Sequence, residues 1–499
     1  MTTVRRAGIL LHPTALPSRW GIGDLASVVP FLDQLAAARQ QVWQVMPLGP
    51  TGYGDSPYQC FSTFAGNTLL IAPDQLIEAG LLPAEAAADI PPFPVDRVDY
   101  GAVIPFKHAL LRQSFAQFVA HATPAQRERC AAFGSANAGW LDDYALFAAL
   151  KAAAGGASWD RWPRALARRE PWALAAARQA HADELAFQRY AQWLFFEQWS
   201  DVRAAAQARG IAIVGDVPIF VAYDSADVWA NPAIFELDGD GQPINVAGVP
   251  PDYFSATGQL WGNPLYRWDV LAQRGFDWWI ARCAAALAVV DIVRLDHFRG
   301  FAGYWSVPAG AATAIDGRWL PGPGVALFDA LRAALGDLPF IAEDLGLITP
   351  DVDALRLSCD LPGMRVLHFA FGGDAGNAYL PHNYVARTVV YTGTHDNDTT
   401  RGWWRQAPPQ IVDHVRRYLG RDGHDIAWDL IRAAWASVAE LAVVPLQDVL
   451  DLGSEARMNT PGTTGGNWGW RVTPGAITPA HLSRLAELTE WYGRAPAAG

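Results

Sequence analysis

Eight short apolar runs, each bounded by polar or turn-forming residues, are the main feature of the hydrophobic pattern along this chain. Near-continuous runs of Val, Ile and Leu are typical of strands that are covered on both faces. The pattern therefore predicts eight buried strands. They occupy residues 8–12, 41–47, 211–217, 291–296, 339–343, 364–369, 388–392 and 441–446.

Amphipathic stretches with helical periodicity separate most of these runs. Strands that alternate with helices form parallel sheets with right-handed crossovers, and eight such units close into a barrel. The sequence therefore predicts an α/β fold of the (β/α)8 TIM barrel class. A doubly wound open sheet is the competing fold, but no GxGxxG motif follows the first run. The clearest helical stretches are residues 25–39, 183–209, 278–290, 325–335 and 426–441.

The uneven spacing of the runs predicts one catalytic barrel over residues 1–499 with three insertions. The first insertion, at about 60–185, is Ala-rich and mostly helical in pattern. The second, 218–277, is predicted to form substrate-covering loops, because long ordered loops after barrel strands usually build the site. The third, 397–425, is small. The residues after the last run have the pattern of helix and loop, so we expect no C-terminal β-sandwich.

The composition excludes a disordered chain and disfavours anionic partners. Hydrophobic residues make up 51% and charged residues 18%, whereas disorder requires low hydrophobicity and high charge. The 38 Lys and Arg residues against 50 Asp and Glu residues give a net charge of −12. Such a chain lacks the positive field that attracts phosphate backbones and anionic lipids, so we expect no nucleic acid and no membrane as partners.

Nothing in the sequence pattern predicts export or membrane insertion. No segment approaches the roughly 20 apolar residues that cross a bilayer, and the run at 7–11 is shorter than the about 7–15 apolar residues of a signal sequence. Cys60, Cys130, Cys283 and Cys359 are far apart and form no CxxC motif, which is typical of free thiols in a reducing compartment. We therefore expect a cytoplasmic protein.

Acidic residues follow four of the predicted strands, at the ends where a TIM barrel holds its active site. The third run leads to Asp216, the fourth to Asp296, the fifth to Glu343 and the seventh to Asp396. A single one of these residues could be a helix N-cap, but their joint occurrence at one rim favours a site. Arg294 lies two residues before Asp296 and faces the same side of its strand, where its guanidinium favours the ionised carboxylate.

Several carboxylates at one barrel rim, with no evident metal cluster, are typical of glycoside chemistry. Retaining cleavage needs one ionised carboxylate that attacks the anomeric carbon and a second, protonated carboxyl group that donates to the leaving oxygen. The aromatic content, with 22 Trp, 14 Tyr and 22 Phe, adds mild support. Most of these rings belong in a core, but flat rings on loops also bind the apolar faces of sugars.

The chain resembles glycoside hydrolase family 77, the amylomaltases or 4-α-glucanotransferases of the α-amylase clan, over essentially its full length. Several long motifs in the family's order carry this resemblance. They are HPTALPSRWGIGDL (12–25), PLGPTGYGDSPYQ (47–59), GDVPIFVAYDSADVW (215–229), GVPPDYFSATGQLWGNPLY (248–266), RLDHFRG (294–300), AEDLG (342–346), THDNDT (394–399) and GTTGGNW (462–468).

The resemblance implies roles for individual residues. Asp296 is implied as the nucleophile, Glu343 as the general acid/base, and Asp396 as the group that stabilises the distorted sugar. The α-amylase clan's usual histidine has no match after Asp216, which leaves the role of Asp216 open. The implied substrate-binding residues are Tyr58 as a stacking platform, Arg294 and His395 at the cleaved sugar, and Asp252, Phe254 and Trp261 over the acceptor sugars. Asp216, His297, Asn467 and Trp468 are also implied as substrate-binding, without a finer place.

The reaction that the resemblance implies is disproportionation of α-1,4-glucans. A glucan segment would pass from a donor, through a covalent ester on Asp296, to the 4-hydroxyl of an acceptor, with cyclic glucans as a minor product. The implied partners are maltooligosaccharides, amylose and glycogen-derived chains, and we expect no cofactor, no metal, and a monomer or weak homo-oligomer. The stretch 238–241 (DGDG) lacks the remaining ligands of a calcium loop and predicts a turn.

Three other interpretations stay open at this point. An α-amylase-type hydrolase would use the same three acids. A metal-dependent barrel hydrolase would use His12, His297, His395 and Asp396 as ligands, although a single histidine near a strand end is more often structural. A non-catalytic glucan-binding or scaffold protein is the third, and the presence of all three acids argues against it.

Overall fold

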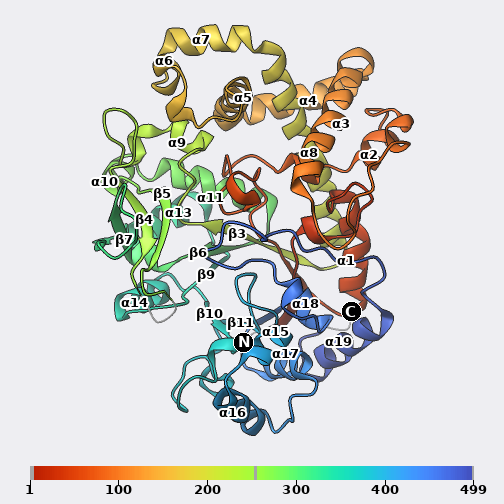
Figure 1. Ribbon diagram of the computed structural model, residues 1–499, viewed down its shortest axis with the longest axis vertical. Helices are drawn as coiled ribbons and strands as arrows, with labels where there is room; N and C mark the ends of the chain where they lie inside the picture. Colours follow the sequence, from red (N-terminus) through yellow and green to blue (C-terminus); the bar gives the residue numbers. More distant parts are fainter. Residues whose placement is uncertain (1–4, 252–254, 497–499) are drawn as a thin grey trace.

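The computed structural model describes residues 5–251 and 255–496, and in this part of the chain eight parallel strands form a closed barrel (Figure 1). The strands follow one another around the barrel in chain order, and β1 closes it by pairing with both β2 and β12. Each predicted run overlaps one barrel strand, so the predicted TIM barrel is confirmed. The strands are β1 (Arg6–Leu10), β2 (Val42–Gln44), β3 (Ala212–Pro218), β6 (Ile292–Asp296), β9 (Phe340–Ala342), β10 (Gly363–Val366), β11 (Thr388–Tyr391) and β12 (Leu441–Pro445).

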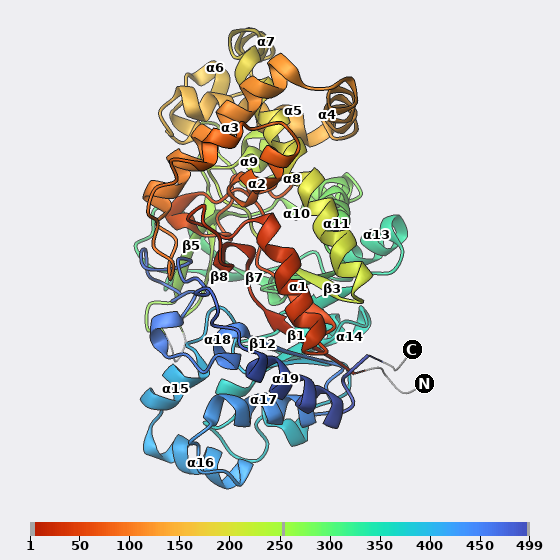
Figure 2. The ribbon, with the colours of Figure 1, turned by 90° about the vertical axis from the view of Figure 1, so that its right-hand side faces the viewer.

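Helices surround the barrel, and each of the five predicted helical stretches overlaps one of them (Figures 1 and 2). The stretch 25–39 begins with a short 3-10 turn, in which the Asp24 side chain accepts a hydrogen bond from the Ser27 amide. The stretch 426–441 is helical only to Ala436; a short connection follows, and its last residue belongs to β12. These surrounding helices are α1 (Val28–Ala37), α8 (Ala182–Ala208), α11 (Asp277–Val289), α13 (Val325–Leu335), α14 (Pro350–Ser358) and α17 (Ile426–Ala436).

The barrel interior is a packed apolar core below a polar rim. Successive strand residues point to opposite faces, so alternate residues pack inside and the others pack against the helices. Leu10, Val214, Met364 and Tyr391 belong to the interior cluster, and all of them are buried. This core supports Arg294, whose Nε lies 3.4 Å from the Met364 sulfur.

The chain between β2 and β3 is mostly irregular up to residue 99 and mostly helical from Tyr100 onward, and its helices rise above the barrel in Figures 1 and 2. Most tryptophans in the molecule fill cores: Trp193, Trp199 and Trp229 are fully buried in or beside this region. The helices there are α2 (Pro73–Glu78), α3 (Tyr100–His121), α4 (Pro124–Ala136), α5 (Ala138–Ala153), α6 (Arg164–Ala167) and α7 (Pro171–Ala180).

A second, antiparallel sheet lies beside the barrel, in the order β5-β4-β7-β8. Two of its strands and two short helices, α9 (Ala226–Ala230) and α10 (Trp268–Gln273), lie within 218–277, where the sequence predicted loops, so that segment is more regular than expected. The predicted turn at 238–241 is present, because the Asp238 carboxylate accepts hydrogen bonds from two amides of its own loop. The strands are β4 (Asn245–Val249), β5 (Gln259–Pro264), β7 (Gly303–Pro308) and β8 (Arg318–Pro321).

The remaining described segments are helical or irregular. The small insertion before β12 forms α15 (Thr400–Gln406) and α16 (Pro409–Leu419), and α18 (Leu446–Val449) and α19 (Pro479–Trp491) follow β12. None of the described helices is long and apolar enough to cross a membrane. All four cysteines are free, as predicted.

Candidate active site

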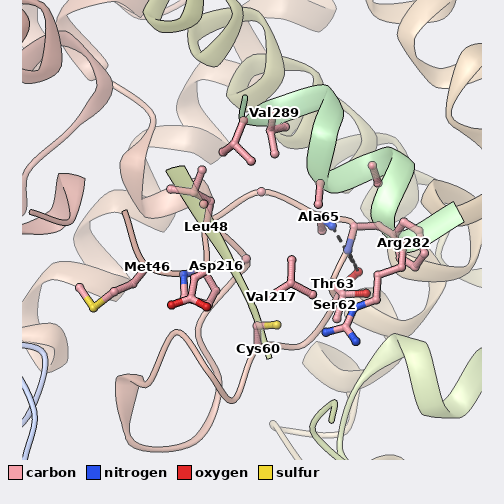
Figure 3. A pocket seen from close by; sticks show the side chains of 18 of the residues that line it. Met46, Leu48, Cys60, Ser62, Thr63, Ala65, Asp216, Val217, Arg282 and Val289 are labelled. Atoms are coloured by element: carbon pink, nitrogen blue, oxygen red, sulfur yellow. Dashed lines mark hydrogen bonds between the residues drawn. The ribbon is translucent and has the colours of Figure 1, made fainter. Parts of the chain in front are cut away.

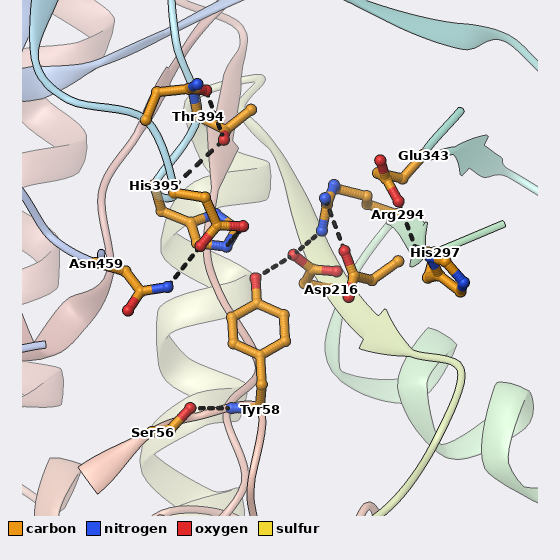
Figure 4. A network of polar contacts seen from close by, with 12 residues as sticks. Ser56, Tyr58, Asp216, Arg294, His297, Glu343, Thr394, His395 and Asn459 are labelled. Atoms are coloured by element: carbon orange, nitrogen blue, oxygen red, sulfur yellow. Dashed lines mark hydrogen bonds and ion pairs between the residues drawn. The ribbon is translucent and has the colours of Figure 1, made fainter. Parts of the chain in front are cut away.

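The predicted acids meet at the carboxyl ends of the barrel strands (Figure 4). Asp216 lies on β3 directly opposite Arg294 on β6, and Asp296 is the last residue of β6. Glu343 follows β9, and the loop after β11 contributes Asp396. These side chains therefore lie on one rim, as their places after the predicted strands indicated.

Arg294 holds two of the carboxylates. Its Nη1 lies 2.6 Å from Asp216 Oδ2, and its Nη2 lies 2.8 Å from Asp296 Oδ1. The side chains of Arg294 and Asp216 are 4% and 1% exposed, whereas that of Asp296 is 27% exposed. A buried guanidinium thus supplies the countercharge for a carboxylate that still faces the open side of the site, as their spacing of two residues predicted.

Glu343 lies beside Asp296 but in different surroundings. Its two carboxyl oxygens accept hydrogen bonds from the amides of His297 (2.7 Å) and Leu345 (3.0 Å). Burial, and then the neighbouring Asp296 carboxylate, raise the pKa of Glu343 to about 8. His297 has a φ of 55°, and this left-handed turn directly after β6 accompanies the amide's hydrogen bond to Glu343. Glu343 is therefore mainly protonated at neutral pH.

Asp396 lies across the rim from this pair and is 42% exposed. Its Oδ2 is 3.4 Å from His395 Nε2, and its Oδ1 accepts a hydrogen bond of 2.6 Å from Asn459 Nδ2. The backbone oxygen of Asp396 also accepts a hydrogen bond, of 2.6 Å, from the Arg457 guanidinium. The pattern of the sequence did not single out Asn459 or Arg457, because they lie in an irregular segment with no periodicity.

Tyr58 contacts both Asp216 on one side of the rim and His395 on the other. Its hydroxyl donates a hydrogen bond of 2.7 Å to Asp216. Its ring stacks on His395, with the ring centroids 5.1 Å apart and the planes inclined by 17°, and the Trp468 ring lies 5.7 Å away. Burial, and then the charge of Asp216, raise the pKa of Tyr58 well above its ordinary value, so the phenol remains a hydrogen-bond donor. The three rings form an aromatic cluster beside the acids.

The antiparallel sheet contributes Trp261, which lies on β5. Its ring contacts the His297 ring edge to face, with the centroids 4.7 Å apart. Burial lowers the pKa of His297 to about 4, so this imidazole is neutral. Asp252 and Phe254, which were also predicted for this side of the site, lie outside the described residues.

The amide of Asn467 is engaged within its own loop. Its Oδ1 accepts from the Thr460 amide at 3.0 Å, and its Nδ2 donates to both the backbone and the hydroxyl oxygen of Thr463. The structure therefore places Asn467 as a brace of the 460–467 loop, and its predicted contact with substrate stays a prediction.

Other parts of the molecule offer less for a different chemistry. Within residues 5–251 and 255–496, no group of three or more His, Cys, Asp or Glu side chains is arranged to hold a metal ion, so the metal-dependent interpretation has no ligand set there. Burial, and then the charge of His395, lower the pKa of His12 to about 3. A cavity of about 80 Å³ between the 46–66 segment, β3 and α11 (Figure 3) has room for only a few waters, since one water needs roughly 10–15 Å³.

Comparison with known proteins agrees with this geometry. A family model described as 4-alpha-glucanotransferase matches residues 11–478. A 4-alpha-glucanotransferase from Thermus thermophilus is 53% identical over 499 residues, which cover 98% of this chain and 99% of that protein. The chloroplastic/amyloplastic 4-alpha-glucanotransferase of Solanum tuberosum is 45% identical over 501 residues, covering 98% of this chain and 86% of that protein.

A solved structure gives the same result. The amylomaltase from Streptococcus agalactiae in complex with acarbose is 37% identical and superposes with a TM-score of 0.96, covering 99% of this chain and 100% of that chain. The chain therefore belongs to glycoside hydrolase family 77, the 4-α-glucanotransferases or amylomaltases, and is a glycosyl-transferring enzyme.

Proposed function

We propose that this enzyme transfers segments of α-1,4-glucans from a donor to an acceptor by two successive displacements, with retention of the anomeric configuration. The observation that carries the proposal is the contrast between two neighbouring acids. Asp296 has the buried Arg294 guanidinium as its countercharge, whereas burial keeps Glu343 protonated. Retaining transfer requires this combination of an ionised and a neutral carboxyl group.

In the first displacement, an Asp296 oxygen attacks the anomeric carbon of the donor. The bond from that carbon to the glycosidic oxygen breaks, and Glu343 gives its proton to the leaving oxygen. The products are a shortened glucan with a free 4-hydroxyl and a glucosyl ester on Asp296. Glu343 is left as a carboxylate, stabilised by the amides of His297 and Leu345.

In the second displacement, Glu343 takes the proton from the 4-hydroxyl of an acceptor glucan. The acceptor oxygen forms a new bond to the anomeric carbon, and the ester bond to Asp296 breaks. When the acceptor is the far end of the same chain, the product is a cyclic glucan, which we expect as a minor product.

The surrounding residues suit this chemistry. Asp396 has a partly exposed carboxylate, and the partly exposed Tyr58 ring, backed by the buried His395 and Trp468, can stack on the apolar face of a sugar. Asp216 is 1% exposed and bonded to Tyr58 and Arg294, which favours a role in positioning them over direct contact with sugar.

The acceptor side is proposed to include Asp252, Phe254, Trp261 and His297, with Asn467 bracing its loop. Transfer competes with water only if an acceptor is held in place, which raises its effective concentration, and if bulk water is kept from the ester. The relative from Streptococcus agalactiae was solved with acarbose, a maltooligosaccharide analogue, which supports α-1,4-glucans as the substrate class.

Incubation with pure maltotriose tests the proposal. We expect glucose together with a ladder of longer oligomers, because each transfer lengthens one chain as it shortens another. An α-amylase-type hydrolase would give only shorter products. The Asp296→Asn variant serves as the control for contaminating activity. Shorter products alone from the wild-type enzyme would contradict the transfer assignment.

A further inference from the structure

The segment 457–459 makes three hydrogen bonds to Asp396, the third acid, and to His395, the residue before it. Asn459 Nδ2 donates to Asp396 Oδ1 at 2.6 Å (Figure 4). The Asn459 amide donates to the His395 backbone oxygen at 3.1 Å. Arg457 donates to the backbone oxygen of Asp396 at 2.6 Å. Both the side chain and the main chain of Asp396 are therefore held from one short segment.

The same segment is itself braced and continues into the loop that carries Trp468. Arg457 Nε donates to the Asn459 backbone oxygen at 2.7 Å, and the Trp468 amide donates to the Met458 oxygen, also at 2.7 Å. The Trp468 ring lies 6.0 Å from the ring of His395. Asn459 thus sits where the irregular segment, the aromatic cluster and Asp396 meet.

The contact between Asn459 and Asp396 is the shorter of the two that hold the carboxylate. The other, to His395 Nε2, is 3.4 Å long, and the Asp396 side chain is 42% exposed. An exposed carboxylate held at one oxygen by a short hydrogen bond loses rotational freedom that it would otherwise keep. The other oxygen, Oδ2, lies on the side of His395 and remains free to contact a substrate.

We infer that Asn459 is a positioning residue that fixes the Asp396 carboxylate for the transition state, an assignment that rests on the proposed role of Asp396. Placement of a charged group matters most where charge develops, so its loss lowers kcat more than it raises KM. Asn459 touches no reacting atom in this account and acts only through Asp396.

Replacing Asn459 by Asp makes the contact pH-dependent. Two carboxylates in direct contact share one proton, because both cannot ionise without strong repulsion. When the two carboxyl groups of the variant share one proton, they keep a hydrogen bond like the one between the Asn459 amide and Asp396 in the wild type. When both are ionised, that hydrogen bond is lost. The other titratable or charged groups that face Asp396 are His395, Arg457 and Tyr58, and they are the same in the wild type and the variant.

The test compares Asn459→Ala, Asn459→Asp and the wild type in maltotriose disproportionation from pH 5 to pH 9. We expect the Ala variant to lose about 10- to 100-fold in kcat at every pH, with a much smaller change in KM. The Asp variant is expected to regain activity toward pH 5 and to lose it on the alkaline side at a lower pH than the wild type. Because each pH point uses the same folded protein, this profile separates positioning from misfolding.

Asn383→Asp is the matched control. The Asn383 amide also donates hydrogen bonds to backbone oxygens, at 2.8 and 2.9 Å, but it lies in the exposed turn before β11. We expect its pH profile to match that of the wild type.

Two results would overturn the inference: wild-type kcat in Asn459→Ala, or an alkaline limb in Asn459→Asp that coincides with that of the wild type. Asp396→Asn separates this failure from a failure of the proposed function. If Asp396→Asn is inactive while the Asn459 variants behave as wild type, only the positioning role fails. If Asp396→Asn keeps full activity, the proposed function itself fails.

Discussion

At the scale of single residues, the surroundings of Glu343 and Asp296 decide what two similar acids can do. The two hydrogen bonds to the Glu343 carboxyl group come from neutral amides, and desolvation together with the Asp296 charge outweighs the more distant pull of Arg294 on its pKa. Asp296 has a direct ion pair with a guanidinium. Glu343, which keeps its proton, is therefore able to donate it, and Asp296, paired with the guanidinium, is able to attack carbon.

The raised pKa of Glu343 predicts the alkaline limb of the pH profile. The first displacement needs the protonated form, so kcat/KM should be steady below pH 8 and fall as the pH rises through about 8, approaching tenfold per pH unit. Initial rates with maltotriose far below KM measure this. A kcat/KM that remains flat to pH 10 would contradict the assignment of Glu343 as the acid.

The raised pKa of Glu343 also makes the stability of the folded protein depend on pH. Because the pKa of Glu343 is raised in the folded protein, the folded chain binds this proton more tightly than the unfolded chain does. The stabilisation is complete below the ordinary pKa of a glutamate and is lost as the pH rises through about 8. Rates must therefore be recorded well below the unfolding temperature, so that loss of folded enzyme is not mistaken for loss of the proton.

At the scale of elements, the junction of β9 and β10 sets the place of Glu343. These strands share only the pair Gly363 and Ala342. The carboxylate of Asp344 extends the junction by accepting a hydrogen bond of 2.6 Å from the Met364 amide. It also lies 3.3 Å from the guanidinium of Arg356, and its side chain is 2% exposed.

This arrangement predicts a large stability difference between two substitutions that each remove a partner of Arg356. Asp344→Ala leaves the buried Met364 amide without its acceptor and removes the buried ion pair from Arg356, which keeps Asp353 and a backbone oxygen as partners. We therefore expect a loss of about 2–4 kcal/mol in the free energy of unfolding. Asp353→Ala removes an ion pair of 3.4 Å whose carboxylate is 49% exposed, so we expect about 0–1 kcal/mol. Urea unfolding measures both, and equal midpoints would refute the structural role of Asp344.

The elements that the sequence predicted correctly share one physical property. Barrel strands are covered on both faces, so β11 and β12 are fully buried and, apart from Thr388, apolar, and this pattern predicts them from the sequence. The strands β4 and β5 have Gly, Asn and Pro among their residues, and β5 also has exposed positions, so their pattern resembles a loop. Trp261 on β5 was therefore found through the family resemblance, and not through periodicity.

At the scale of the whole molecule, the site is assembled from distant parts of the chain. The acids that the sequence predicted lie at the ends of barrel strands or in the loops that follow them, and the fold class alone indicates where strand ends meet. The contacts that hold them come from elsewhere: Tyr58 from the segment after β2, Trp261 from the second sheet, and Asn459 with Trp468 from the segment after β12. Such contacts depend on loop conformation, and no local pattern in the sequence predicts them.

This assembly also gives a physical reason for the length of the chain. A barrel alone would present the acids to bulk water, where an ester on Asp296 would be hydrolysed. The segments around the rim surround the acids with rings and neutral donors, which favour a bound sugar acceptor over free water. We propose that the decorated barrel acts as one catalytic unit.

The division of labour between Asp296 and Glu343 is tested most directly by trapping the covalent intermediate. A glucosyl fluoride of the α configuration has a leaving group that needs no proton, so Glu343→Gln should still form the ester but release it slowly. Mass spectrometry of the digested variant should then find the added glucosyl mass on the peptide that contains Asp296, and none in the double variant with Asp296→Asn. A fluoride donor that is consumed without this adduct, or an adduct on another residue, would contradict the account.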